Sequence, residues 1–119
     1  MRIHHLAMRT RRLVRLESFY TTVLGFSVIH RDGTRSVWLA AGDAIVMLED
    51  AEAGEPGIAP GTMELVAFAV GKEDVARHRR ILAENNVAVE AETIYTIYFR
   101  DPDGRRIALS HFPGEAART

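Results

Sequence analysis

The 119-residue chain contains no cysteine. Disulfide bonds, thiolate metal sites and cysteine nucleophiles are therefore excluded, and the absence fits a reducing compartment. No apolar run approaches the roughly 18 residues that span a bilayer. Met1 leads directly into an alternating segment rather than into a charged leader with an apolar stretch. We therefore expect a cytoplasmic protein with no membrane partner.

The chain also has almost no net charge. A formal value of −1 argues against a general affinity for nucleic acid. Five arginines near the N-terminus form a local basic cluster, which we interpret as a solvated or substrate-facing patch, with an anionic partner as the alternative. They are Arg2, Arg9, Arg11, Arg12 and Arg15. Hydrophobic residues at 47% and charged residues at 26% are typical of one globular domain.

The first half of the chain alternates between strand and helix periodicity. Residues 3–9 place His5, Ala7 and Arg9 on one face and apolar side chains on the other, which predicts a strand. Apolar residues at helical spacing predict a helix over 13–24, and Gly25 follows where a left-handed residue suits a helix end. Strands are predicted over 27–31, 36–40 and 44–49.

The second half repeats this order about 60 residues later. Residues 51–61, rich in Gly, Pro and acidic residues, are predicted to be a linker. The predicted elements that follow are a strand over 63–70, a helix over 73–85 and strands over 87–91, 95–99 and 106–112. We therefore predict a single α+β domain over 1–119. Its two tandem β-α-β-β-β modules, about 1–50 and about 62–113, would form a curved mixed sheet around a small-molecule cup.

Three segments carry a resemblance to a known family. They are Ile-His-His-Leu-Ala-Met at 3–8, Phe-Tyr-Thr-Thr-Val-Leu-Gly-Phe at 19–26, and Tyr-Phe-Arg-Asp-Pro-Asp-Gly-Arg-Arg-Ile at 98–107. In this order they resemble the vicinal oxygen chelate superfamily, which includes glyoxalases, extradiol dioxygenases, fosfomycin-modifying enzymes and bleomycin-sequestering proteins. The resemblance implies the same paired β-α-β-β-β fold that the periodicity predicts.

The resemblance also implies a divalent metal that is held by His and Glu and chelates two neighbouring substrate oxygens. The family's metal positions fall on His5, on Met47 or Glu49, on Leu65 and on Ala108. Only His5 and Glu49 can coordinate a metal, whereas three protein ligands are the norm for a catalytic metal. The metal site is therefore predicted to be incomplete, with His5 and Glu49 as its remaining ligands or as polar groups of the cup.

Strand alternation predicts which side chains line the cup. Thr96 and Tyr98 are expected to face it, and fosfomycin-modifying relatives use a hydroxyl-bearing residue at the position matching Tyr98. Such an apolar lining with few polar groups suits an aromatic, oxygenated or anionic ligand. The full set of predicted ligand-binding residues is Arg9, Trp38, Met47, Leu65, Thr96, Tyr98, Ala108 and Ser110.

Three further histidines are predicted to lie outside this cup. His4 is expected on the face opposite His5, at an interface or a helix contact. His78 is predicted to lie on the inner face of the second helix, and His111 is predicted to pack with apolar neighbours of the last strand.

Two functions from different classes remain open. One is an enzyme, a lyase, isomerase, dioxygenase or transferase, with His5 and Glu49 as base or metal pair and Tyr98 as hydrogen-bond donor. The other is a binder that sequesters a small molecule without a metal, which the apolar residues Leu65 and Ala108 favour. In either case a homodimer is expected, because each module leaves sheet edges open.

Overall fold

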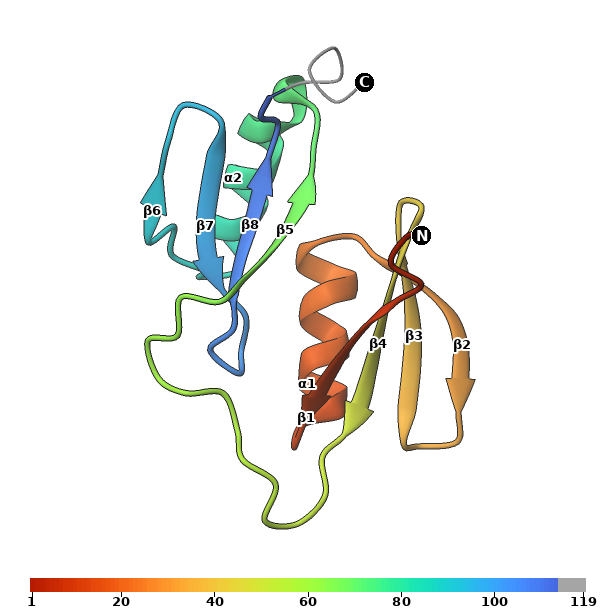
Figure 1. The fold of residues 1–119 in the computed structure, drawn as a ribbon. Coiled ribbons are helices and arrows are strands. Elements are labelled where there is room, and N and C mark those ends of the chain that lie inside the picture. The colour runs from red at the N-terminus through yellow and green to blue at the C-terminus, as the bar shows by residue number, and fades with distance from the viewer. Residues whose placement is uncertain (114–119) are drawn as a thin grey trace. The chain divides into compact units, whose positions relative to one another are not determined.

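The computed structural model describes residues 1–113. The chain divides into two compact units, with the boundary between Gly57 and Ile58, inside the segment predicted to be a linker. Each unit has its own four-stranded mixed sheet and one main helix (Figure 1). The α+β class and the repeated β-α-β-β-β order predicted from the sequence are confirmed.

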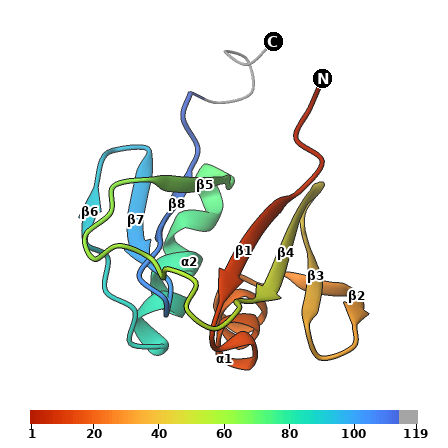
Figure 2. The ribbon, with the colours of Figure 1, turned by 60° about the horizontal axis from the view of Figure 1, so that its bottom comes forward.

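The first unit builds its sheet in the order β1-β4-β3-β2. β1 runs parallel to β4, the other neighbours are antiparallel, and Figure 2 shows β1 beside β4 with α1 against the sheet. Its elements are β1 (Leu6–Thr10), α1 (Leu13–Ser18), the π-helix η1 (Phe19–Val23), β2 (Ser27–Asp32), β3 (Ser36–Ala41) and β4 (Ala44–Asp50).

The apolar face of this sheet and the helix enclose the core of the first unit. Its buried apolar residues are Met8, Leu16, Phe19, Tyr20, Val23, Val37, Leu39, Val46 and Leu48. Successive side chains of a strand point to opposite faces, so the alternate residues occupy the other side. We call that side the first open face, and it carries Ala7, Arg9, Trp38, Met47 and Glu49.

The helix predicted over 13–24 is present, but its second half is a π-helix rather than an α-helix. The amide of Leu24 donates to the carbonyl of Phe19 at 3.4 Å, five residues earlier. Gly25 then takes the left-handed conformation that the sequence predicted, with φ of +74°. Phe26 closes the end by stacking on Tyr20, with ring centroids 5.6 Å apart.

The second unit repeats the arrangement with the sheet order β5-β8-β7-β6. Its elements are β5 (Leu65–Ala69), the 3₁₀-helix η2 (Lys72–Asp74), α2 (Val75–Glu84), β6 (Ala91–Glu92), β7 (Thr96–Arg100) and β8 (Arg106–Ser110). The strand predicted over 87–91 is wrong in extent, because regular pairing with β7 involves only Ala91 and Glu92.

Helix α2 and one face of this sheet form the second core. Leu82, Ile97, Phe99 and Ile107 are buried there. His78 lies on the same side of the helix, as predicted, and burial lowers the pKa of its imidazole. We call the opposite side of the sheet the second open face, and it carries Leu65, Ala67, Thr96, Tyr98, Ala108 and Ser110.

Candidate functional site on the open faces

The imidazole of His5 lies against Trp38 on the first open face. The two ring centroids are 4.8 Å apart with an interplanar angle of 53°. Residue 5 precedes β1 directly, and β1 and β3 flank β4, where Ala7 and Trp38 are both register partners of Met47. The small Ala7 side chain leaves the His5–Trp38 pair at the surface, with both residues half-buried.

His4 also contacts His5, which corrects the prediction that His4 points to the opposite face. The two Nδ1 atoms are 2.9 Å apart, so one imidazole donates and the other accepts. Residues 3–5 precede the first strand, and strand alternation does not constrain them. The two histidines therefore form one polar group next to Trp38.

Arg9 makes two carboxylate contacts on the same face. It is the register partner of Glu49 and forms an ion pair with it. Its guanidinium also donates to both oxygens of Glu55, from Nη2 at 2.7 Å and from Nε at 3.0 Å. These bonds, together with the Glu52 amide, lower the pKa of Glu55 to about 2, and they raise the pKa of Arg9. The sequence predicted Arg9 as a ligand-facing cation but did not predict Glu55 as its partner.

The donor groups do not fit a three-ligand metal site. Glu49 is ion-paired with Arg9, His5 contacts His4, and positions 65 and 108 are Leu and Ala. Across residues 1–113, no group of three or more His, Asp or Glu side chains is arranged to hold a metal ion. A catalytic metal ordinarily has three protein ligands and an open position.

Tyr98 is fixed on the second open face by a stacked cation. The guanidinium carbon of Arg106 lies 4.2 Å from its ring centroid. Glu90 accepts hydrogen bonds from Arg106 at 2.8 Å and from Arg100 at 3.0 Å, and these bonds lower the pKa of its carboxyl group. No local sequence pattern indicated Glu90, because Arg100, Arg106 and Glu90 come from two separate strands and a loop.

The remaining predicted residues of this unit lie around Tyr98. Ala108 is its register partner and has no exposed surface, so it can only form the floor of a site. Next to that pair, Thr96 and Ser110 share a hydrogen bond of 2.7 Å between their hydroxyl groups. Leu65 is 41% exposed. The predicted site residues therefore form two sets, one on each open face, with five members in each: His5, Arg9, Trp38, Met47 and Glu49, and Leu65, Thr96, Tyr98, Ala108 and Ser110.

A family model describing the glyoxalase/bleomycin resistance protein/dioxygenase superfamily matches residues 2–109. The match covers nearly the whole chain, and the chain belongs to this superfamily. The resemblance seen in the three sequence segments is thereby confirmed. No curated protein matches the chain significantly.

Solved structures share the fold at low sequence identity. A lactoylglutathione lyase from Agrobacterium tumefaciens is 21% identical, with 92% of each chain covered and a TM-score of 0.73. A fosfomycin resistance protein FosX from Listeria monocytogenes is 16% identical, covering 92% of this chain and 89% of its own, with a TM-score of 0.79. A possible glyoxalase from Bacillus cereus is 23% identical over 92% and 98%, with a TM-score of 0.76.

In the part of the chain that the structure describes, no helix is both long enough and apolar enough to cross a bilayer.

Proposed function

We propose that this protein binds a small aromatic or oxygenated molecule and that its own chain does not supply a complete metal site. The observation that carries the proposal is the composition of the first open face. The imidazole of His5 lies tilted against the only tryptophan, while the carboxylate of Glu49 forms an ion pair with Arg9. An aromatic surface with a few polar groups is typical of small-molecule sites.

The second candidate is a metal-dependent lyase, isomerase, dioxygenase or transferase that uses His5 and Glu49. Its support is the strand register, which places Glu49 beside Arg9 on the same face as the His5–Trp38 pair. A FosX structure from Listeria monocytogenes contains Mn(II) and 1S,2S-dihydroxypropylphosphonic acid. In this chain Tyr98 would act as the hydrogen-bond donor, and a divalent metal would stabilise negative charge on a substrate oxygen.

Metal content separates the two candidates. We expect the purified protein to carry substoichiometric Ni, Mn, Fe or Zn by elemental mass spectrometry. Chelator should leave its melting temperature nearly unchanged, because a weakly bound metal stabilises only by its excess over its dissociation constant. Stoichiometric, tightly held metal whose removal lowers the melting temperature would instead support the enzyme.

Trp38 provides a direct reading of ligand binding, because it is the only tryptophan. Native mass spectrometry of freshly purified protein should reveal a retained small molecule, and titration with that molecule should change Trp38 fluorescence. His5→Ala should weaken binding by about tenfold, which corresponds to 1.4 kcal/mol. Val14→Ala, an exposed change on α1, is the matched control and should leave binding unchanged. Equal affinity in all variants would contradict the proposed site.

We further propose that the protein acts in the cytoplasm as a homodimer. The absence of cysteine supports a reducing compartment. Support for the dimer comes from β2, an edge strand on which every residue is exposed, including the apolar Val28 and Ile29.

A further inference from the structure

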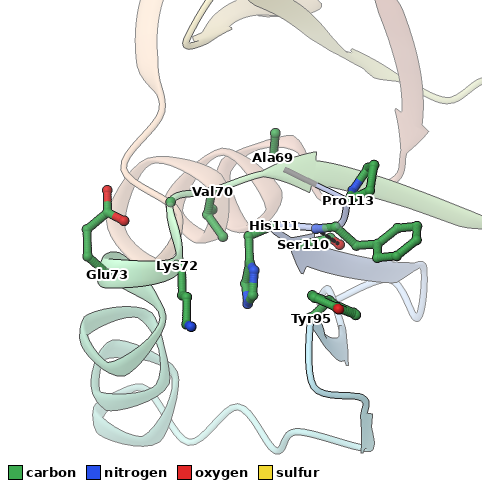
Figure 3. A pocket seen from close by; sticks show the side chains of 10 residues that line it. Ala69, Val70, Lys72, Glu73, Tyr95, Ser110, His111 and Pro113 are labelled. Carbon is green, nitrogen blue, oxygen red and sulfur yellow. Dashed lines mark hydrogen bonds between the residues drawn. The ribbon is translucent and has the colours of Figure 1, made fainter. Parts of the chain in front are cut away.

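A cavity lies within the second unit, at the end where β5 leads into η2. Its volume is about 720 Å³, within the usual range of small-molecule sites. Val70, Lys72, Tyr95, Ser110, His111 and Phe112 are among the residues that line it (Figure 3). Apart from Ser110, none of these side chains belongs to the two open faces, and the sequence patterns did not single out this place.

Backbone hydrogen bonds fix the walls of this cavity. The amide of Val70 donates to the carbonyl of Ser110 at 3.0 Å and joins the chain after β5 to the end of β8. The amide of His111 donates to the carbonyl of Tyr95 at 3.0 Å. The Tyr95 ring then contacts the rings of His111 and Phe112, with centroid distances of 5.4 and 4.8 Å. Tyr95 and Phe112 nevertheless remain 38% and 61% exposed, so they offer apolar surface to a ligand.

Lys72 gives the cavity a positive charge. It is the only lysine in the chain, and within residues 1–113 it forms no ion pair. Figure 3 shows Lys72 and His111 projecting in the same direction into the space between the helix and Tyr95, whereas the side chain of Glu73, which also lines the cavity, projects in another direction. The Glu73 carboxylate folds back over Gly71, where an added Cβ would lie 2.8 Å from Glu73 Cδ.

We propose that this cavity binds a small aromatic acid. The aromatic body packs against Tyr95 and Phe112, and the carboxylate or phosphonate group accepts hydrogen bonds from Lys72 Nζ and the imidazole of His111. A charge-assisted hydrogen bond is roughly twice as strong as a neutral one, and the ring contacts add apolar burial. The site shares Ser110 with the second open face, but its charged group and its aromatic wall are different residues.

Amine labelling tests this proposal at one atom. The intact protein is treated with an amine-acetylating reagent, with and without phenylphosphonate or benzoate, and modification is read by peptide mass spectrometry. Because Lys72 carries the only side-chain amine, bound ligand should slow its acetylation at least about threefold while the N-terminal amine reacts at an unchanged rate. Inorganic phosphate has the anionic group without a ring, and benzyl alcohol has the ring without an anionic group. Each should protect Lys72 at least tenfold less well at equal concentration. No protection by either aromatic acid, or equal protection by inorganic phosphate, would overturn the proposal.

Calorimetric titration with phenylphosphonate measures how substitutions in the cavity change the affinity. Lys72→Met and Tyr95→Ala should each weaken binding by about tenfold or more, whereas Lys72→Arg and Tyr95→Phe should retain most of it. Arg80→Met removes the same charge from an exposed position of α2 outside the cavity and should have no effect. If the ligand protects Lys72 from acetylation equally well in His5→Ala, this site is distinct from the site of the proposed function. If Lys72→Met and Arg80→Met lose the same affinity for phenylphosphonate, the binding is nonspecific charge attraction and the proposal is wrong.

Discussion

At the scale of residues, ion pairs organise the open faces more than they stabilise them. Arg9 pairs with Glu49 and Glu55, Arg106 pairs with Glu90, and all three pairs are at least partly exposed. Exposed pairs contribute about 0–1 kcal/mol to stability. Their main effect is to hold long side chains in one position, as Glu90 does for the guanidinium that stacks on Tyr98.

Glu55 provides a pH-dependent test of one such pair. Folding lowers the pKa of its carboxyl group from 4.5 to about 2, so its contribution to stability is present above about pH 4.5 and is lost as the pH falls towards 2. Glu55→Gln should therefore reduce the loss of stability between pH 6 and pH 3, measured as the shift in the urea midpoint. Glu64→Gln, at an exposed position, is the control. Identical pH profiles for wild type and Glu55→Gln would show that the Arg9–Glu55 pair does not form in solution.

Sequence periodicity could predict which side chains of a strand lie on the same side of the sheet, but not which residues form ion pairs with each other. The alternation at 7–9 and 96–98 agrees with the strand register, which places Ala7 with Arg9 on one side of the first sheet and Thr96 with Tyr98 on one side of the second. Segment 51–61 was predicted only as a linker, because an ion pair such as Arg9–Glu55 joins residues 46 positions apart and leaves no local pattern. The cavity beside Lys72 was missed for the same reason, although a single lysine among fifteen Lys and Arg residues was a visible signal.

At the scale of elements, the end of the first helix depends on one glycine. Gly25 has a φ of +74°, and no atom lies within 4 Å of where its Cβ would be, so a substitution there strains the backbone without a clash. Gly25→Val should lower the free energy of unfolding by more than about 1 kcal/mol. Both variants are compared with the wild type by thermal melting. Gly57→Ala places a Cβ 3.4 Å from Arg11 at a position without a left-handed φ, and it should leave the free energy of unfolding nearly unchanged. A Gly25→Val protein with an unchanged midpoint would contradict the observed helix end.

Element boundaries were the least predictable part of the fold. Apolar spacing over 13–24 is compatible with both an α-helix and the observed π-helix, since the hydrogen-bond spacing lengthens from four residues to five only over Phe19–Val23. Val87 and Val89 favoured a strand by composition, yet regular pairing begins only at Ala91. Strand composition describes a half-buried surface and does not by itself supply a hydrogen-bonded neighbour.

At the scale of the whole molecule, we expect analytical ultracentrifugation to show a dimer at about 10 μM. Ile29→Lys should shift the equilibrium towards monomer, because it places a charge on the exposed edge strand β2. Thr34→Lys, in the turn after β2, adds the same charge away from the strand and serves as control. A monomer at all micromolar concentrations would contradict the proposed homodimer, and an unaffected Ile29→Lys dimer would assign the interface to another surface.

The single lysine also has a consequence for how this protein can be handled. Coupling through primary amines, the usual way to fix a protein to a biosensor chip or to attach a dye, can reach only the N-terminus and Lys72. A molecule immobilised through Lys72 would present its cavity to the matrix, and such a surface would understate binding at this place. A biotin attached enzymatically through a peptide tag would leave the Lys72 amine unmodified and should give a higher active fraction on the same chip.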